Sequence, residues 1–137
     1  MNATYGFVYC GVAGVGLGIF RVTGSELVGI DFAGSKYRGT IIEDRKTGEI
    51  NLSIEMTVPV GVFLVQGTSP QDLPYIKSAS VNVPPNFGDG KPFEVFFAPG
   101  PVTLMVRQIP DDYAQYADGV AVNIVPSGPQ SSPAGAA

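Results

Sequence analysis

The side chains that could carry chemistry in this 137-residue chain are mainly carboxylates, because histidine is absent and cysteine occurs once, as Cys10. Serine–histidine–aspartate triads and the common transition-metal sites need residue types that the chain lacks. A single cysteine forms no internal disulfide, and we expect Cys10 to be a buried strand residue. The sequence therefore predicts no catalytic residue, no metal ligand and no cofactor, and we expect a protein that is not an enzyme.

A cluster of charged residues lies between two predicted strands, at residues 43–49. It begins with Glu43 and Asp44, and a general acid would need such a carboxyl group to be buried, with a raised pKa. Arg45 and Lys46 follow directly and favour the charged form instead. We interpret the cluster as the solvated tip of a hairpin, and we expect these four residues to bind a partner. Replacing the two carboxylates is expected to leave stability nearly unchanged.

A second carboxylate, Asp31, lies among apolar residues in LVGIDFAG and close in sequence to Tyr37. A buried carboxylate must be paired or hydrogen-bonded, so we expect Asp31 to close a turn with a hydrogen bond. Asp31 and Tyr37 are therefore candidates for a structural role or for a ligand site. The apolar stretches FVY, GIF, VFLV and FEVFF would line a ligand cavity if the interior is hollow, and would form a filled core otherwise.

Short strands separated by turns are the elements that must position these residues. Glycine occurs 18 times and proline 12 times, spread between β-branched and aromatic runs, which is typical of an all-β chain. In residues 49–57 apolar side chains alternate with polar ones, so one face of that strand is expected to be buried. We predict strands over residues 4–10, 15–22, 26–32, 36–43, 49–57, 61–66, 76–83, 93–98 and 102–109.

Strands joined by loops too short for parallel crossovers predict an antiparallel sheet. Closing the sheet removes its exposed edges, so we predict an all-β fold, a small antiparallel eight-stranded barrel, with a sandwich as the alternative. At most one short C-terminal helix is expected, over residues 111–118, with Asp111 or Asp112 as its cap. We assign residues 1–125 to a single barrel domain and residues 126–137 to a disordered tail.

Charge and hydropathy narrow the classes of partner. The net charge is -4, and no cluster of basic residues exceeds two, so we expect no nucleic-acid partner. No apolar run reaches about 18 residues, so we expect no membrane span. No basic segment precedes the first apolar stretch, so we expect no signal peptide and a cytoplasmic location.

The glycines of GVAGVGLG lack the spacing of a phosphate-binding loop, and we interpret them as points where a strand bends or another backbone comes close.

One pattern of residues resembles a known family. The pattern has three parts: a glycine and an aspartate, then a tyrosine and a glycine two residues apart, and then an acidic pair before a strand. In this sequence its residues are Gly29, Asp31, Tyr37, Gly39, Glu43 and Asp44. This pattern resembles the GrlR family, which are negative regulators of type III secretion gene expression. The opening residues 4–32 are also similar to the start of that family, with a first strand, a glycine-containing second strand and a tight turn.

The resemblance implies a lipocalin-like eight-stranded barrel with an apolar interior that forms a homodimer. It also implies that a run of four residues, acidic in the best-known member, docks a transcriptional activator. That run falls on Glu43, Asp44, Arg45 and Lys46, of which only the first two are acidic here. We therefore expect a protein–protein interaction module, a regulator that docks a partner through the 43–49 loop. The alternative is a lipocalin-type binder of a small apolar ligand in the barrel interior.

Overall fold

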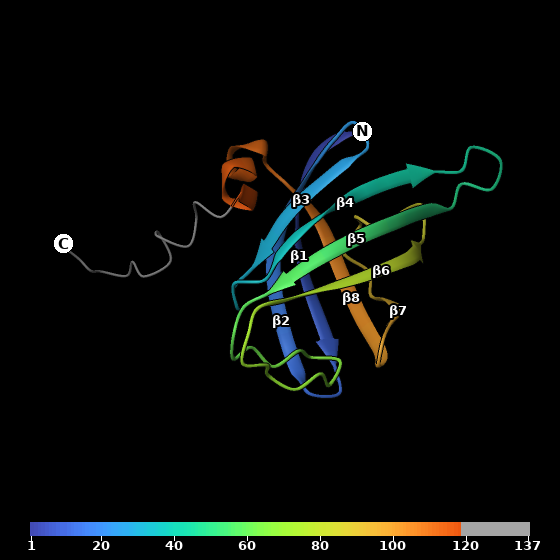
Figure 1. Ribbon diagram of the computed structural model, residues 1–137. Coiled ribbons are helices and arrows are strands. Elements are labelled where there is room, and N and C mark those ends of the chain that lie inside the picture. Colours follow the sequence, from blue (N-terminus) through green and yellow to red (C-terminus); the bar gives the residue numbers. More distant parts are fainter. Residues whose placement is uncertain (119–137) are drawn as a thin grey trace, which may run out of the picture.

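Eight antiparallel strands form one sheet that curls into a nearly closed barrel (Figure 1). The computed structural model describes residues 1–118. The expected tail and the expected end of the domain at residue 125 lie outside the described residues. The strands are β1 (Asn2–Gly11), β2 (Gly14–Thr23), β3 (Glu26–Asp31), β4 (Lys36–Glu43), β5 (Ile50–Val58), β6 (Tyr75–Val83), β7 (Phe93–Phe97) and β8 (Gly100–Ile109).

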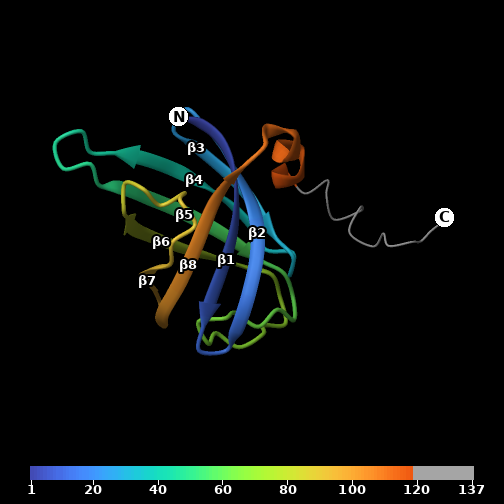
Figure 2. The same cartoon turned by 180° about the vertical axis from the view of Figure 1, so that it is seen from behind.

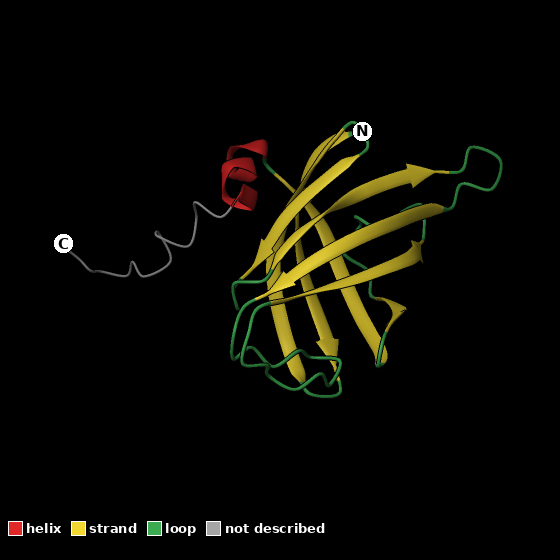
Figure 3. Cartoon of the chain, in the orientation of Figure 1, coloured by secondary structure: helices red, strands yellow, loops and turns green. Residues whose placement is uncertain are grey.

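The order of the strands across the sheet is β6-β5-β4-β3-β2-β1-β8-β7. The two edge strands, β6 and β7, contact each other, and this contact brings the barrel close to closure. Figure 3 shows how the strands cross the barrel and how loops gather at its ends. The prediction of an all-β antiparallel barrel with one short helix is confirmed, because every pair of neighbouring strands in the sheet is antiparallel.

The hydrophobic core fills the inside of the barrel, where every second side chain of each strand points. On β1 these residues are Ala3, Tyr5, Phe7 and Tyr9, and on β5 they are Ile50, Leu52, Ile54 and Met56. The alternation predicted for residues 49–57 is confirmed by the burial of β5, whose even-numbered apolar positions face inward. The period-two pattern therefore determines which side chains of a strand are buried in the barrel and which face the solvent.

The outer surface of the barrel has two different halves. Over β4, β5 and β6 it is mainly polar, apart from the exposed Ile42 and Ile76, and Asn51 donates hydrogen bonds to Ser80 and Asn82 over 3.1 Å each. Over one part of β1, β2 and β8 it is apolar, since Val8 is the cross-strand partner of both Leu17 and Met105. Arg21 and Arg107 lie on the same face further along these strands. We call this apolar part the apolar wall, and it consists of Val8, Cys10, Val15, Leu17, Ile19, Phe32 and Met105. The expectation that Cys10 is buried is therefore wrong. Cys10 is a strand residue, but it is half-buried and lies on the outside of the barrel.

The prediction of a strand over residues 61–66 is wrong. Residues 59–74 form an irregular loop between β5 and β6, in which Gly61 and Gly67 have positive φ values of 78° and 112°. A short apolar run does not by itself distinguish a strand from another buried segment. Here the run turns inward, where Leu64 and Val65 are buried. The Val65 carbonyl accepts a hydrogen bond of 2.7 Å from Ala13 N, so the loop covers one end of the barrel.

The predicted helix is present as a 3-10 helix, η1 (Asp111–Asp118), which lies against β2 and β3 on the outside of the barrel (Figure 2). Thr4 Oγ1 donates a hydrogen bond to the Asp111 carboxylate over 3.3 Å at its start. At its end, Arg21 pairs with Asp118 over 2.9 Å. These two contacts fix the helix across the outer face. Within residues 1–118, no helix has the length and apolar character needed to cross a membrane.

Candidate functional site

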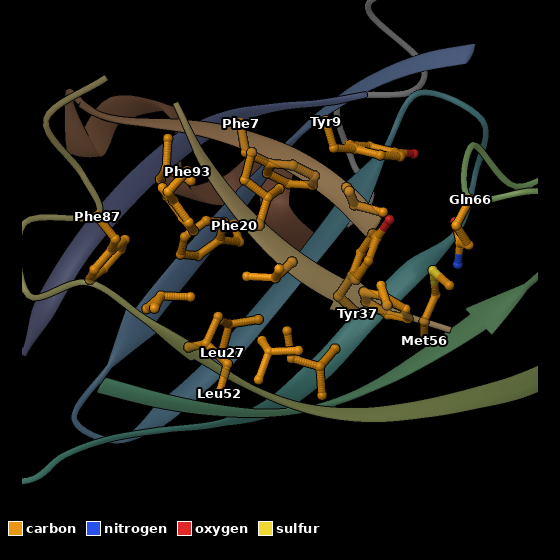
Figure 4. Close-up of a pocket in the computed structure, with 18 of the residues that line it drawn as sticks. Phe7, Tyr9, Phe20, Leu27, Tyr37, Leu52, Met56, Gln66, Phe87 and Phe93 are labelled. Carbon is orange, nitrogen blue, oxygen red and sulfur yellow. The ribbon is translucent and has the colours of Figure 1, made fainter. Parts of the chain in front are cut away.

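The interior of the barrel contains a cavity of about 100 Å³. Figure 4 shows Phe87 at one end of it and Gln66 at the other. These two residues come from the loops at residues 84–92 and 59–74, one at each end of the barrel. Three of the lining side chains have polar groups, namely Tyr9, Tyr37 and Gln66. The other lining side chains are apolar: Phe7, Phe20, Leu27, Leu52, Ile54, Met56, Leu64, Val81, Val83, Phe87, Phe93, Val95, Phe97, Val102, Leu104 and Val106.

Phe7 is the centre of an aromatic cluster along one side of the cavity. Its ring lies 5.7 Å from that of Tyr9 and 5.8 Å from those of Phe20 and Tyr37. The Phe7 and Tyr37 rings meet edge to face at 85°, which is a favoured arrangement for aromatic pairs. The cluster gives this side of the cavity a rigid wall, because each ring is held by its neighbours and has few rotatable bonds.

A hydrogen-bonded group, the tyrosine–aspartate cluster, lies at the end of this wall and consists of Tyr9, Asp31 and Tyr37. The Asp31 side chain is 2% exposed. Its Oδ2 accepts hydrogen bonds from the hydroxyls of Tyr9 over 2.7 Å and Tyr37 over 2.6 Å. Its Oδ1 accepts a third, of 3.0 Å, from the backbone N–H of Ser35. The carboxylate is therefore buried with three donors around it, which offset the cost of removing it from water.

The turn after β3 holds Asp31 in place. The backbone N–H of Asp31 donates to the Ser35 carbonyl, and the N–H of Gly34 donates to the Asp31 carbonyl, both over 3.0 Å. Together with the bond from Ser35 N to the side chain, these contacts form the turn-closing hydrogen bonds expected from the sequence. Gly34 has a φ of 98°, a left-handed conformation that glycine adopts without steric cost.

Glycines on β2 make room for the rings that reach the cluster. Tyr9 pairs with Gly16 and Phe7 pairs with Gly18 across the β1–β2 ladder. A Cβ atom at Gly16 would overlap the Tyr9 ring, and one at Gly18 would overlap the Phe7 ring and the backbone of β3. The interpretation of GVAGVGLG as a place of close approach is therefore confirmed at Gly18. The missing side chains let Tyr9 of β1 reach across β2 to Asp31 of β3.

The electrostatics of the cluster keep both phenols protonated. Burial raises the pKa of Tyr37 well above the ordinary tyrosine value, and the negative charge of Asp31 raises it further. Burial is also the main reason why the pKa of Tyr9 is raised, and the Asp31 charge again adds to it. A phenolate beside a buried carboxylate would place two like charges in a medium of low polarity. Both hydroxyls are therefore donors to Asp31.

The structure separates the two groups of candidate residues named from the sequence. It joins Asp31 and Tyr37 through the 2.6 Å hydrogen bond, and it adds Tyr9 and the backbone of Ser35, which sequence analysis did not single out. The alternation in TYGFVYC places Tyr9 on the same face as Phe7, and this signal could have identified it as an interior residue. No sequence signal pointed to the Ser35 backbone.

The other group lies at the tip of the β4–β5 hairpin, which projects away from the barrel (Figure 1). Glu43, Asp44, Arg45 and Lys46 are all exposed there. The Asp44 carboxylate accepts a hydrogen bond from Lys46 N over 2.9 Å, and the Asp44 carbonyl accepts one from Gly48 N over 2.7 Å. Asp44 thus stabilises the turn, as aspartates commonly do by bonding to the backbone two residues on. The small effect on stability expected from replacing both carboxylates stays a prediction, and these contacts give Asp44 a role in the turn.

Fold and cavity together define the class: a small antiparallel β-barrel with an apolar interior and one buried polar cluster. No family model, no curated protein and no solved structure matches this chain. The similarity to the GrlR family therefore stays a prediction that rests on the six residues of the pattern and on the opening strands.

Proposed function

We propose that this protein binds a small apolar molecule in the interior of its barrel. The observation that carries the proposal is the cavity of about 100 Å³ behind almost wholly apolar walls. Protein interiors are close-packed, and voids larger than a water molecule are few. A buried water needs two to four polar partners, so apolar walls favour an apolar molecule over water.

The size of the cavity limits the ligand. An engineered apolar cavity of about 150 Å³ takes up benzene, so a void of this order accepts a molecule of one ring or a few carbons. We therefore propose a monocyclic or short-chain ligand and a role in binding, without catalysis.

Fluorobenzene is a suitable first probe, because its ¹⁹F signal reports binding directly. We expect a saturable change in that signal, shifts in the methyl resonances of Leu104 and Val102, and a higher melting temperature by mass action. Val81 lines the cavity from the edge strand β6, so Val81→Phe is expected to fill the void and abolish binding. Ile76→Phe, on the outer face of the same strand, is the matched control. Unchanged spectra at saturating fluorobenzene would contradict the proposal.

A second role, docking of a protein partner, is supported by the projecting β4–β5 hairpin with its exposed mixed charges. We propose that Glu43, Asp44, Arg45 and Lys46 contact a regulatory partner in the cytoplasm. The Glu43→Ala/Asp44→Asn variant removes both negative charges, while the asparagine oxygen can still accept the bond from Lys46 N. We expect this variant to recover less of any partner that the wild-type protein retains in a pull-down. Equal recovery of the partner by the variant and by the wild-type protein would exclude the hairpin as the docking site.

The predicted homodimer also belongs to this proposal. The apolar wall supports it, because the opposite half of the outer surface is mainly polar, with Ile42 and Ile76 as its exposed apolar residues. Phe32 and Val15 of the wall are 63% and 66% exposed. Contiguous apolar surface on a small protein marks an interaction site. Two such walls, one from each copy, would pack face to face as two sheets do.

A further inference from the structure

We propose that one end of the barrel docks on a lipid membrane whose surface has no net charge, through exposed apolar side chains on the loops at that end. The proposal goes beyond ligand binding in the cavity and does not depend on it. We call this end the apolar tip. It shares no residue with the apolar wall, and its residues are Val12, Val60, Phe63, Leu73 and Phe96.

Contacts between loops bring these residues to the same end of the barrel. The β1–β2 turn, which carries Val12, donates a hydrogen bond of 2.7 Å to the Val65 carbonyl in the long loop between β5 and β6. Phe96 comes four residues before Gly100 on the β7–β8 hairpin, and a Cβ atom at Gly100 would lie 3.9 Å from Val12 Cγ1. Figure 1 shows the turn and the long loop together at the end of the barrel opposite to the N-terminus.

The side chains of the apolar tip are exposed, although the loop that carries most of them has a paired backbone. Their exposed fractions range from 54% to 78%. Within the loop, Gly61 N donates to the Gln71 carbonyl over 3.1 Å. Leu64 N donates to the Thr68 carbonyl over 3.0 Å. Backbone groups that are paired inside the protein keep their hydrogen bonds next to lipid, so the apolar side chains can leave water at little polar cost.

The distribution of charge favours a lipid surface without net charge. The segments that form the apolar tip, residues 11–15, 59–74 and 95–101, contain one charged residue, Asp72. Residues 43–49, at the opposite end of β5, contain five. The molecule thus has a charged end suited to water and an end that is nearly free of charge. Anionic lipids attract clusters of lysine and arginine, and they repel a chain with a net charge of -4 and no basic residue at its tip.

A lipid surface also suits the shape of the apolar tip better than a protein partner does. Protein interfaces need a matching surface with a rim of hydrogen bonds. The boundary between headgroups and acyl chains is fluid, and it accepts aromatic and aliphatic side chains such as Phe63 and Leu73 without a matched shape. The loop at residues 59–74 also contributes Leu64 and Gln66 to the cavity lining. Docking would therefore bring one end of the cavity to a phase in which small apolar molecules dissolve.

A single tryptophan tests the position of the apolar tip, because the natural chain contains none. Vesicles of phosphatidylcholine are expected to shift the emission of Phe63→Trp to shorter wavelength, and phosphatidylcholine brominated on its acyl chains is expected to quench it. Ile42→Trp is the matched control, since Ile42 is 59% exposed near the charged end of β4 and should show neither effect. Unchanged emission of Phe63→Trp, or equal quenching of both variants, would overturn the proposal.

Flotation with the same vesicles measures the partition coefficient of the full chain. Phe63→Ser/Leu73→Ser is expected to lower it by at least about tenfold, because two apolar side chains no longer leave water. Ile42→Ser/Tyr113→Ser removes two exposed apolar side chains elsewhere and should bind like the wild type. Added phosphatidylglycerol should weaken binding, and stronger binding would overturn the choice of lipid.

A second copy of the chain is the competing occupant of the apolar tip. A shift in the emission of Phe63→Trp that grows with protein concentration in the absence of vesicles would show that a second copy covers the tip, and it would overturn the proposal. An emission that is independent of protein concentration until vesicles are added supports it. Binding of fluorobenzene is measured without lipid, so failure of membrane docking leaves the proposed ligand binding standing.

Discussion

Tyr37 and Asp31 are joined by a hydrogen bond of 2.6 Å that links β4 to the end of β3 on the inner side of the barrel wall. Tyr9 donates to the same oxygen from β1, although β2 lies between β1 and β3 in the sheet. One carboxylate oxygen thus connects three strands through side chains alone. Contacts that combine distant strands in this way are absent in the unfolded chain, so they add to the cooperativity of folding.

Loss of the Tyr37 hydroxyl is expected to destabilise the fold. A hydrogen bond to a charged group contributes about 1.5–3 kcal/mol, so Tyr37→Phe should lower the free energy of unfolding by about that amount. Urea denaturation followed by circular dichroism measures it. Tyr113→Phe is the control, since Tyr113 is 46% exposed on η1 and is expected to change stability by less than about 0.5 kcal/mol. A Tyr37→Phe variant with the same free energy of unfolding as the wild type would argue against a structural role of the cluster.

Alkaline pH is expected to weaken the fold through the same residue. The folded protein holds the Tyr37 pKa above the ordinary value near 10, so above that pH the unfolded chain loses this proton first. The contribution is complete below pH 10 and falls by up to about 1.4 kcal/mol per pH unit above it. Denaturation at several pH values from 8 to 11 should therefore give a shallower decline for Tyr37→Phe than for wild type. Parallel curves would contradict the assignment.

A methyl group at Gly16 is expected to displace the Tyr9 ring. The added Cβ overlaps that ring, so its packing against Phe7 and its hydrogen bond to Asp31 would have to shift. We expect Gly16→Ala to cost about 1–3 kcal/mol, the range of overpacked cores, and to lower affinity for the cavity ligand. Gly6→Ala is the matched control, because a Cβ there meets only Ile109 Cγ2 at 3.8 Å. Equal melting temperatures for the two variants would show that the ring tolerates displacement.

The two carboxylates at the hairpin tip are expected to differ. Asp44→Ala removes the 2.9 Å bond to Lys46 N, and we expect a loss of about 0.5–1.5 kcal/mol. Glu43→Ala should stay within about 0.5 kcal/mol of wild type, because that side chain is exposed. Thermal melts of both single variants and of Asp44→Asn separate the charge from the turn contact. A loss at Glu43 as large as at Asp44 would reverse this reasoning.

Self-association is expected to depend on the apolar wall. Light scattering of the wild-type protein should give twice the chain mass of 14.3 kDa. Charges at Val15 and Leu17, introduced as Val15→Glu/Leu17→Glu, are expected to give the monomer, because they would be desolvated in the interface. Ile76→Glu, on the polar half of the surface, should stay dimeric. A monomeric wild type, or a dimer that survives the double substitution, would exclude the wall as the interface.

The sequence by itself determined the class of fold. Period-two alternation in segments such as residues 49–57 and short Gly- and Pro-rich turns are local properties, and they are sufficient to predict an antiparallel barrel, most strand positions and the exposed tip at residues 43–49. Local chemistry also pointed to Asp31, because a carboxylate among apolar residues needs donors nearby in the chain, and the Ser35 backbone and Tyr37 supply two of them.

Only the tertiary structure decided the rest. The apolar run around Leu64 covers the barrel end because an open end remained to be filled, and nothing within residues 61–66 records that need. Tyr9 reaches Asp31 because Gly16 and Gly18 lie between them in space, which depends on the register of two ladders. The cavity itself is the space left when side chains from all the strands have packed. A void of this kind is a property of the whole arrangement, so no local pattern of residues could predict it.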